Sequence, residues 1–359
     1  MRFVLALVLA LVSCQVDAQS VMFPGPGLGV SVAAAYTGPG DVVSGALGWW
    51  GLRAYNMAYA TGSNNAANIR RASDNSTTNI VILSSGAFDI ATANTFAGTD
   101  ATCSGSTSGS SKTIAFTGCS STPTANDTVS GSGITQPSLI VGCGTFVAGA
   151  GSCTLNAAQN ISVAETVTMQ VAIYVTELND QTGTGNNLTQ GTNASQPQLL
   201  PTCSTGLPCF YFPTSATYYL TTSISQVQPF SFVLYGIRIA NFTTYQNVFG
   251  SGPLIGWNNV ANQMQLYCGT ANIAISATDS AWHAGVGVCN GLSTTLYVDA
   301  GTNTGSGGTA LSGTFSLGAA RGSGSSPFQG GEIEEAGLYG SAISSGNASS
   351  LISNMQAYW

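Results

Sequence analysis

Short alternating runs of apolar and polar residues, separated by clusters of glycine, asparagine and serine, constrain the fold of this chain most strongly. Alternation with a period of two is typical of β-strands that bury one face. Such runs occupy Ser231–Ile237, Gln263–Tyr267, Thr295–Val298 and Glu335–Tyr339. A helical period is found in only two segments, Trp49–Tyr59 and Ala348–Tyr358. The sequence therefore predicts an all-β fold, and a sandwich is the architecture that we expect.

The N-terminus has the three parts of a secretory signal peptide. A charged start is followed by the apolar run Val4–Val12, which is too short to span a membrane. Val16-Asp17-Ala18 fits the rule for ordinary signal peptidase, whereas Leu11-Val12-Ser13-Cys14 resembles a lipobox, whose cysteine would carry lipid. We therefore expect a signal peptide at 1–18 and a secreted protein, extracellular or periplasmic, with lipid anchoring through Cys14 as the alternative. No transmembrane segment is predicted.

The cysteines predict a disulfide-bonded protein. Of nine cysteines, Cys14 falls in the signal region, which leaves an even set of eight. An even set in an exported chain is typical of disulfides, although spacing alone does not settle connectivity. A metal site is disfavoured because the chain has no Cys-x-x-Cys and a single histidine. The neighbouring couples that we expect to pair are Cys103–Cys119, Cys143–Cys153, Cys203–Cys209 and Cys268–Cys289.

Charge argues against one class of partner. Only 6% of the residues are charged and the net charge is −7, whereas binding to nucleic acid needs clustered lysine and arginine. We therefore expect no nucleic-acid partner. A surface this poor in charge must be solvated by Ser, Thr, Asn, Gln and Gly, as in exported β-proteins and in adhesin-like or virion-like proteins.

The segment 98–169 differs from the sequence on either side. It holds four of the cysteines, long Gly/Ser/Thr tracts and only two aromatic residues, Phe116 and Phe146. We interpret it as a small disulfide-stapled β-module inserted into a host sandwich, because a core this thin needs cross-links. The alternative is a disordered linker. The expected organisation is a leader at 19–45, a sandwich from 46–97 and 170–359, and the module between its two parts.

One loop carries a resemblance to a known family. The apolar run Val171–Val175 leads into Asp180-Gln-Thr-Gly-Thr-Gly-Asn-Asn-Leu-Thr-Gln190, in which Gly183 and Gly185 allow positive φ. Asp180 and the asparagines can bond to their own backbone and fix the shape of the loop. The segment resembles Asp-Gln-Ser-Gly-x-Gly-Asn-x-x-Thr-Gln of the α-L-arabinofuranosidase B catalytic domain. Upstream, Asn68–Ile80 resembles the Val-x-Arg-x-Ser-Asp-x-x-Thr-Thr-x-Ile strand and turn of that family.

The resemblance implies a concanavalin-like or laminin-G-like jelly roll and a carbohydrate partner, such as an arabinose-containing polysaccharide. It also implies hydrolysis of terminal α-L-arabinofuranosyl linkages. However, the stretch that corresponds to the family's nucleophile, Pro253–Met264, contains no acid. Inherited catalysis is therefore not the leading interpretation. The leading one is an exported protein that binds glycans, with an active hydrolase and a structural or adhesive surface protein, for example phage-derived, as alternatives.

The remaining catalytic candidates are Glu334, Glu335 and Asp279. The closing strand of laminin-G-like domains is often acidic, and there the acids usually bond to arginines near the first and last strands. Available partners in this chain are Arg53, Arg70, Arg71 and Arg238. Strict strand alternation would place Glu332 and Glu334 on one face and Glu335 on the other. The structural role is the favoured interpretation of the acidic pair.

Sugar-binding grooves combine aromatic faces with amides, and one stretch of the chain has this mixture. It consists of Trp257 with Asn258, Asn259 and Gln263, and the alternative is that Trp257 belongs to the core. Tyr245 and Trp282 are secondary candidates. No cofactor is predicted apart from Ca²⁺, for which Asp299 with loop carbonyls is a weak candidate ligand. His283 could pair with Asp279, and a structural role is expected for it.

Overall fold

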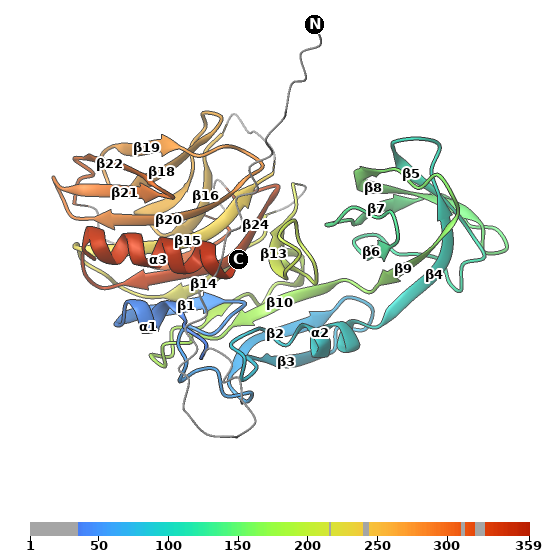
Figure 1. Ribbon diagram of the computed structural model, residues 1–359, viewed down its shortest axis with the longest axis horizontal. Helices are drawn as coiled ribbons and strands as arrows, with labels where there is room; N and C mark the ends of the chain where they lie inside the picture. The colour runs from blue at the N-terminus through green and yellow to red at the C-terminus, as the bar shows by residue number, and fades with distance from the viewer. Residues whose placement is uncertain (1–34, 215–216, 240–243, 310–312, 320–326) are drawn as a thin grey trace, which may run out of the picture. The chain divides into compact units, whose positions relative to one another are not determined.

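The computed structural model describes residues 35–214, 217–239, 244–309, 313–319 and 327–359 (Figure 1). The predicted signal peptide, Cys14 and most of the predicted leader lie outside the described residues. The described strands are antiparallel, and most of them form the two layers of a sandwich, which confirms the predicted all-β sandwich. The two layers are connected through β10 (Ile173–Leu178), which pairs with strands of both.

The first layer runs in the order β3-β2-β10-β12-β13-β24-β15-β20-β21-β22, and β1 pairs with β24. Its strands other than β10 are β1 (Ala46–Gly51), β2 (Asn65–Arg71), β3 (Thr77–Val81), β12 (Gln198–Leu200), β13 (Cys209–Phe212), β15 (Phe230–Arg238), β20 (Trp282–Cys289), β21 (Thr294–Val298), β22 (Gly301–Gly305) and β24 (Gly331–Tyr339). The second layer continues from β10 in the order β11-β14-β23-β16-β17-β18-β19. Its strands are β11 (Leu188–Thr189), β14 (Leu220–Ser223), β16 (Gln246–Gly250), β17 (Leu254–Trp257), β18 (Gln263–Tyr267), β19 (Asn272–Ser276) and β23 (Thr314–Leu317).

The main core lies between these layers. Phe232 from the first layer contacts Phe249 and Phe315 from the second, with ring centroids 5.7 and 6.0 Å apart. All three rings are fully buried. Complete burial of such a side chain contributes roughly 1.5–3 kcal/mol, so this aromatic cluster is a major source of stability.

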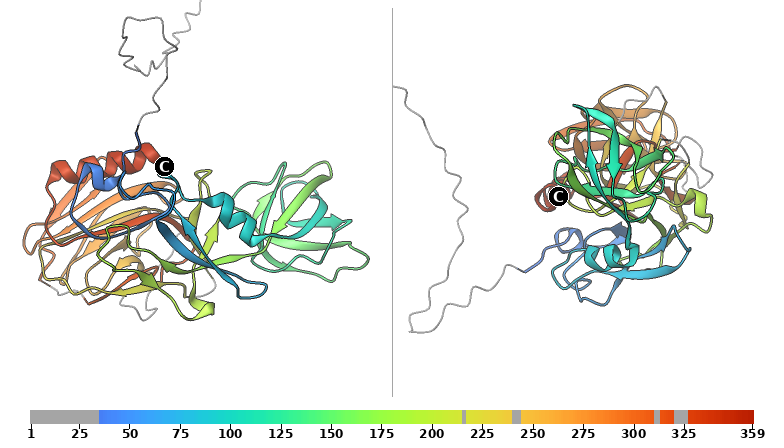
Figure 2. Two further views of the ribbon diagram at one scale, coloured as in Figure 1. Left: turned by 90° about the horizontal axis from the view of Figure 1, so that it is seen from below. Right: turned by 90° about the vertical axis from the view of Figure 1, so that its right-hand side faces the viewer.

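The outer face of the first layer is covered by α3 (Ser345–Tyr358) and, beside it, the short α1 (Pro39–Val42) (Figures 1 and 2). The predicted helix at Ala348–Tyr358 is therefore confirmed. The predicted helix at Trp49–Tyr59 is wrong, because Trp49 and Trp50 belong to β1. Trp49 packs into the cluster under α3 and Trp50 into the main core, and only the alternation of a strand buries two adjacent tryptophans on opposite faces.

Residues Thr99–Gln170 form a separate six-stranded sheet after α2 (Ile90–Ala97), in the order β6-β9-β4-β5-β8-β7. Its strands are β4 (Thr99–Ser106), β5 (Ser111–Thr117), β6 (Thr128–Gly131), β7 (Ile140–Cys143), β8 (Gly151–Gln159) and β9 (Glu165–Gln170). The sheet has its own apolar cluster around Ile114, Phe116 and Met169. Its independence as an inserted module stays a prediction.

All four expected disulfides are present, with the expected partners: Cys103–Cys119, Cys143–Cys153, Cys203–Cys209 and Cys268–Cys289. Four disulfides fit a protein that folds in an oxidising compartment outside the cytosol. Among the described residues, none of the helices has the length and apolarity needed to cross a membrane.

The loop that suggested the family follows β10, leads into β11 and is hydrogen-bonded to β1. Gly183 and Gly185 have φ of 82° and 81°, as expected. The Asp180 carboxylate accepts hydrogen bonds from the backbone N–H of Thr182 and from that of Trp49 in β1. Gln181 extends the connection, since its side chain bonds to Tyr55 N–H and to the Gly51 carbonyl. The motif therefore has a structural role, which is to fasten the loop to the first strand of the sandwich.

Candidate functional site

A β-bulge changes the geometry of the acidic strand β24. Tyr235 of β15 pairs with Glu335, but the next residue, Gly236, pairs with Ile333, so Glu334 is an extra residue in the strand. A bulge reverses the alternation beyond it. Ile333 and Ala336 consequently both enter the main core. Glu332, Glu334 and Glu335 therefore share the outer face, and the prediction that Glu335 takes the opposite face from Glu334 is wrong.

Glu335 is held in a buried ion pair. Its carboxylate accepts from Arg53 Nε at 2.9 Å and from Arg53 Nη2 at 2.6 Å, and both side chains are fully buried. The indole N–H of Trp359 donates to Glu335 Oε1 at 2.9 Å. The Arg53 guanidinium also lies 4.7 Å from the ring centroid of Tyr358. Glu335 thus joins the segment that follows β1, the strand β24 and the end of α3, which is a structural role.

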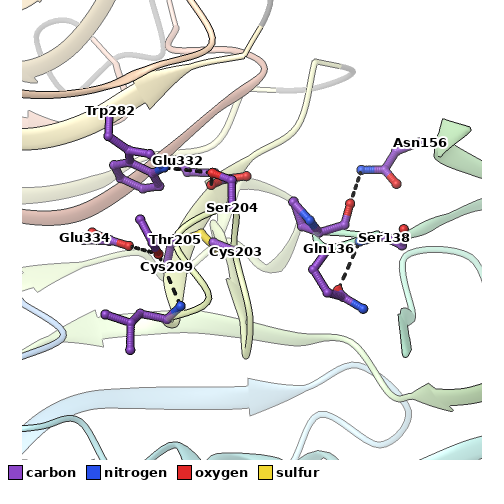
Figure 3. Close-up of a disulfide and its surroundings, with 12 residues drawn as sticks. Gln136, Ser138, Asn156, Cys203, Ser204, Thr205, Cys209, Trp282, Glu332 and Glu334 are labelled. Atoms are coloured by element: carbon purple, nitrogen blue, oxygen red, sulfur yellow. Dashed lines mark hydrogen bonds between the residues drawn. A yellow bond between two sulfur atoms is a disulfide. The ribbon is translucent and has the colours of Figure 1, made fainter. Parts of the chain in front are cut away.

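Glu332 and Glu334 are covered by the loop that the Cys203–Cys209 disulfide closes (Figure 3). Ser204 Oγ donates to Glu332 Oε2 at 3.2 Å, and Thr205 Oγ1 donates to Glu334 Oε1 at 2.7 Å. The second oxygen of each carboxyl is buried and has no hydrogen-bond partner among the described residues. The half-buried Trp282 donates its indole N–H to Ser204 Oγ and helps to hold the loop.

The environment of these two acids favours their neutral forms. Burial, together with the nearby Glu335 and Glu332, raises the pKa of Glu334 to about 9 against the opposing effects of the Thr205 hydrogen bond and Arg53. Burial also raises the pKa of Glu332 to about 7, although the hydrogen bonds from Ser204 oppose it. At neutral pH the Glu334 carboxyl is therefore protonated, and it is sealed under the loop rather than facing a cavity.

The third catalytic candidate lies elsewhere. Asp279 forms an ion pair with the buried Arg238, in which Nε donates to Asp279 Oδ1 at 2.7 Å. It does not contact His283, whose Nδ1 lies 2.6 Å from Asp299 Oδ2 instead. The three candidates Glu334, Glu335 and Asp279 are thus engaged by Thr205, Arg53 and Arg238 respectively.

Asp299 does not fit the Ca²⁺ role that the sequence left open. Its carboxylate is surrounded by donors: the Ala284 N–H and the Gln356 side-chain amide on Oδ1, and His283 on Oδ2. These donors occupy both oxygens of the carboxylate, and the same hydrogen bonds lower the pKa of Asp299 against the effect of burial. Calcium needs several oxygen ligands converging on one point, and this cluster supplies nitrogen donors.

The predicted sugar platform at Trp257 is buried. The indole is fully enclosed and stacks on Phe328, with centroids 5.4 Å apart and an interplanar angle of 11°. Its neighbour Asn258 donates to Gln263 Oε1 at 2.9 Å, which engages two of the predicted amides with each other. Asn259 alone of the group is exposed. Trp257 therefore occupies a core position, the alternative that the sequence had left open.

A different set of residues lines a cavity of about 320 Å³ on the second layer, here called the tyrosine–amide cavity. It is lined by Tyr245, Asn247, Leu254, Gln265, Tyr267 and Asn272. Asn247 of β16, Gly256 of β17 and Gln265 of β18 are cross-strand partners. The glycine between the two amides is required by the close approach of β16, because a Cβ at Gly256 would clash with the Gln246 carbonyl oxygen.

The polar side chains that line the cavity differ in their burial and in their hydrogen bonds. Gln265 is almost fully buried, and its Oε1 atom accepts no hydrogen bond from the described residues. The Tyr267 hydroxyl donates to the Gly269 carbonyl at 2.8 Å, which fixes that ring, while Tyr245 is 41% exposed. The sequence pointed to Tyr245 only as a secondary candidate and missed Gln265 and Tyr267. The alternation Gln263-Met-Gln-Leu-Tyr267 was the available signal, since it places the polar and aromatic side chains on one face of β18.

Three solved structures share this fold. A GH54 α-L-arabinofuranosidase soaked with a cyclic sulfate inhibitor matches with a TM-score of 0.52 at 13% identity. A mutant GH54 α-L-arabinofuranosidase soaked with 4-nitrophenyl α-L-arabinofuranoside matches with a TM-score of 0.56 at 12% identity. An arabinofuranosidase complexed with arabinofuranosyl-α-1,2-xylobiose matches with a TM-score of 0.51 at 12% identity. Each match covers 89% of this chain and 65% of the other.

The fold is thus that of the GH54 arabinofuranosidase β-sandwich, which confirms the fold implied by the resemblance. At this identity the similarity extends to the fold alone. This chain corresponds to slightly less than two thirds of the length of those enzymes. No protein-family model and no curated protein matches the sequence.

Proposed function

We propose that this protein is exported and binds a neutral glycan of the arabinofuranosyl type in the tyrosine–amide cavity. The observation that carries the proposal is the lining itself, two tyrosine rings and three side-chain amides around about 320 Å³. Sugar rings pack their C–H faces on aromatic rings, and their hydroxyls bond to amides. The arabinofuranosyl ligands of two proteins with the same fold support this choice of sugar.

Binding without hydrolysis is the favoured form of this function. Glycoside hydrolysis ordinarily uses two carboxyl groups on either side of the scissile bond, about 5–5.5 Å apart in retaining enzymes. No acid is among the six lining residues that the structure describes. The acids of the candidate set, Glu334, Glu335 and Asp279, are engaged by Thr205, Arg53 and Arg238.

Calorimetric titration with arabino-oligosaccharides tests the proposal. We expect Tyr245→Ala to weaken binding roughly tenfold, since a central aromatic contact typically contributes more than about 1 kcal/mol. Leu292→Ala is the matched control, because Leu292 is 83% exposed and lies outside the cavity. The variants should melt at the same temperature as the wild type.

Two outcomes would contradict the proposal. Unchanged affinity in Tyr245→Ala would move the site elsewhere, and absence of any sugar binding would favour a structural or adhesive role. Release of nitrophenol from 4-nitrophenyl α-L-arabinofuranoside would show that the protein is an enzyme, and would contradict the assignment of binding alone.

A further inference from the structure

One arginine of the described chain lacks a counter-charge. Of the four arginines that the structure describes, Arg53, Arg71 and Arg238 each form an ion pair with a carboxylate. Arg70 forms none. This is unusual in a chain whose net charge is −7, because acids outnumber the available cations. Buried charges are normally paired, since an unpaired one loses its hydration without compensation.

The Arg70 side chain is nevertheless held in one position. The residue lies on β2 and is only 7% exposed. Its Nε donates to Gln196 Oε1 at 2.7 Å and its Nη1 donates to Asn75 Oδ1 at 2.9 Å. The guanidinium carbon lies 5.0 Å from the ring centroid of Tyr174, the cross-strand partner of Arg70 on β10. Each of these contacts is to a neutral group, so the positive charge remains uncompensated.

The two amides are themselves fixed. Gln196 donates through Nε2 to the Gln190 carbonyl at 2.9 Å, and Asn193 donates to Asn75 Oδ1 at 3.2 Å. The Nη2 amino group of Arg70 donates to none of the described residues, and it is not among the polar atoms sealed from solvent. The guanidinium is therefore pre-oriented, and its remaining donors are the second N–H of Nη1 and the two N–H groups of Nη2. A planar fork of this kind matches the two oxygens of a carboxylate.

We propose that Arg70 binds the carboxylate of an acidic sugar residue, a uronic acid, through the remaining N–H groups of its guanidinium. The choice of a sugar rests on the proposed glycan-binding function, while the choice of a carboxylate rests on Arg70 alone. The ligand supplies the missing negative charge, and the aromatic ring of Tyr174 and the fixed amides keep the guanidinium in place while the site is empty. The site lies on the first layer, and the tyrosine–amide cavity lies on the second.

The test compares an oligogalacturonide with a neutral galactose oligosaccharide of equal length and linkage, both titrated into the wild-type protein. We expect the acidic sugar to bind roughly tenfold to hundredfold more tightly, the range typical of hydrogen bonds to a charged group. Arg70→Gln should abolish this preference. Lys112→Gln removes the same charge from an exposed position and should retain it. Arg70→Lys keeps the positive charge but lacks the planar guanidinium, and it should prefer the acidic sugar less strongly than the wild type does. This variant tests the proposal if Arg70→Gln does not fold.

Equal affinity for the two sugars, no affinity for either, or a full preference in Arg70→Gln would overturn the proposal. Tighter binding of a sulfated than of a carboxylated oligosaccharide would overturn the carboxylate assignment. Arabino-oligosaccharide binding by the same preparation reports separately on the tyrosine–amide cavity. If arabino-oligosaccharides do not bind but the acidic sugar is still preferred, the proposed function alone is refuted. If arabino-oligosaccharides bind but the acidic sugar is not preferred, the Arg70 site alone is refuted.

Discussion

Glu334 and Glu335 are adjacent acids on one face of β24, and we expect neutralising them to change stability in opposite directions. Glu334→Gln replaces a carboxyl that is already protonated in the folded state with a neutral side chain of the same shape. The amide oxygen of the new glutamine would still accept the Thr205 hydroxyl, as the Glu334 carboxyl does at 2.7 Å. Glu335→Gln instead leaves the fully buried Arg53 guanidinium without its carboxylate.

The pKa of Glu334 sets the sign and the size of the first effect. Burial and the neighbouring acids raise it from the ordinary 4.5 to about 9 in the folded protein. The folded state therefore binds a proton that the unfolded state releases, and the resulting stability is complete below pH 4.5 and is lost as pH rises toward 9. One pKa unit corresponds to 1.36 kcal/mol, so the loss between pH 5 and pH 8 is on the order of 4 kcal/mol at most. Glu332 acts in the same direction over a narrower range, because its pKa is about 7.

Urea unfolding between pH 5 and pH 9 measures this effect. We expect the free energy of unfolding of Glu334→Gln to fall much less with pH than that of the wild type. The variant should be the more stable protein at pH 8 and have similar stability at pH 5. Glu335→Gln should lose about 3–5 kcal/mol at neutral pH, the usual cost of removing one partner of a buried ion pair.

Parallel pH dependence of Glu334→Gln and the wild type would refute the reasoning, since Glu334 would then be ionised in the folded state. Equal destabilisation by Glu334→Gln and Glu335→Gln at pH 8 would refute it as well. That result would mean that both acids serve as charged partners of Arg53.

Two further outcomes are expected. Replacing 98–169 by a short Gly/Ser link between Ala97 and Gln170 should leave the sandwich melting cooperatively. A module with its own core can be removed without disrupting the core of the host domain. A broad, non-cooperative transition in calorimetry would instead place the segment in the common core. Replacing both Cys203 and Cys209 by serine should lower the free energy of unfolding by about 2 kcal/mol. It should also make stability depend less on pH in the alkaline range, because a loosened loop admits water to the buried carboxyls. An unchanged pH dependence in chemical unfolding would show that the disulfide does not keep the loop closed.

Local features of this fold could be predicted from the sequence because each depends on residues close together in the chain. The strand pattern of Ser231–Ile237 reports which face is buried, whatever the partner strand is. The Cys268–Cys289 bridge was the expected pairing because the two cysteines are neighbours in an even set, and the structure confirms it. Gly183 and Gly185 identify a turn because few other residues adopt positive φ there.

The candidate sites were harder to predict because they depend on which strands become neighbours. Trp257 and Tyr245 are both aromatic residues next to amides, and nothing local separates them. The stacking partner of Trp257 is Phe328, far away in the sequence, and that contact buries the indole. Tyr245 remains partly exposed beside Gln265 and Tyr267, and the pairing of β16, β17 and β18 forms the cavity between them.

The roles of the charged residues were decided entirely by tertiary structure. The sequence by itself determined that acids and arginines would meet near the closing strand, since a chain with so few charges must pair those that it buries. It could not determine the bulge at Glu334, because a bulge depends on the register between β24 and β15. The register places Glu335 on Arg53 and Glu334 under the disulfide loop, while Arg70 forms no ion pair with a described residue and bonds to neutral amides. Alternation is a property of one strand, but the partner of a buried charge is a property of the assembled sheet.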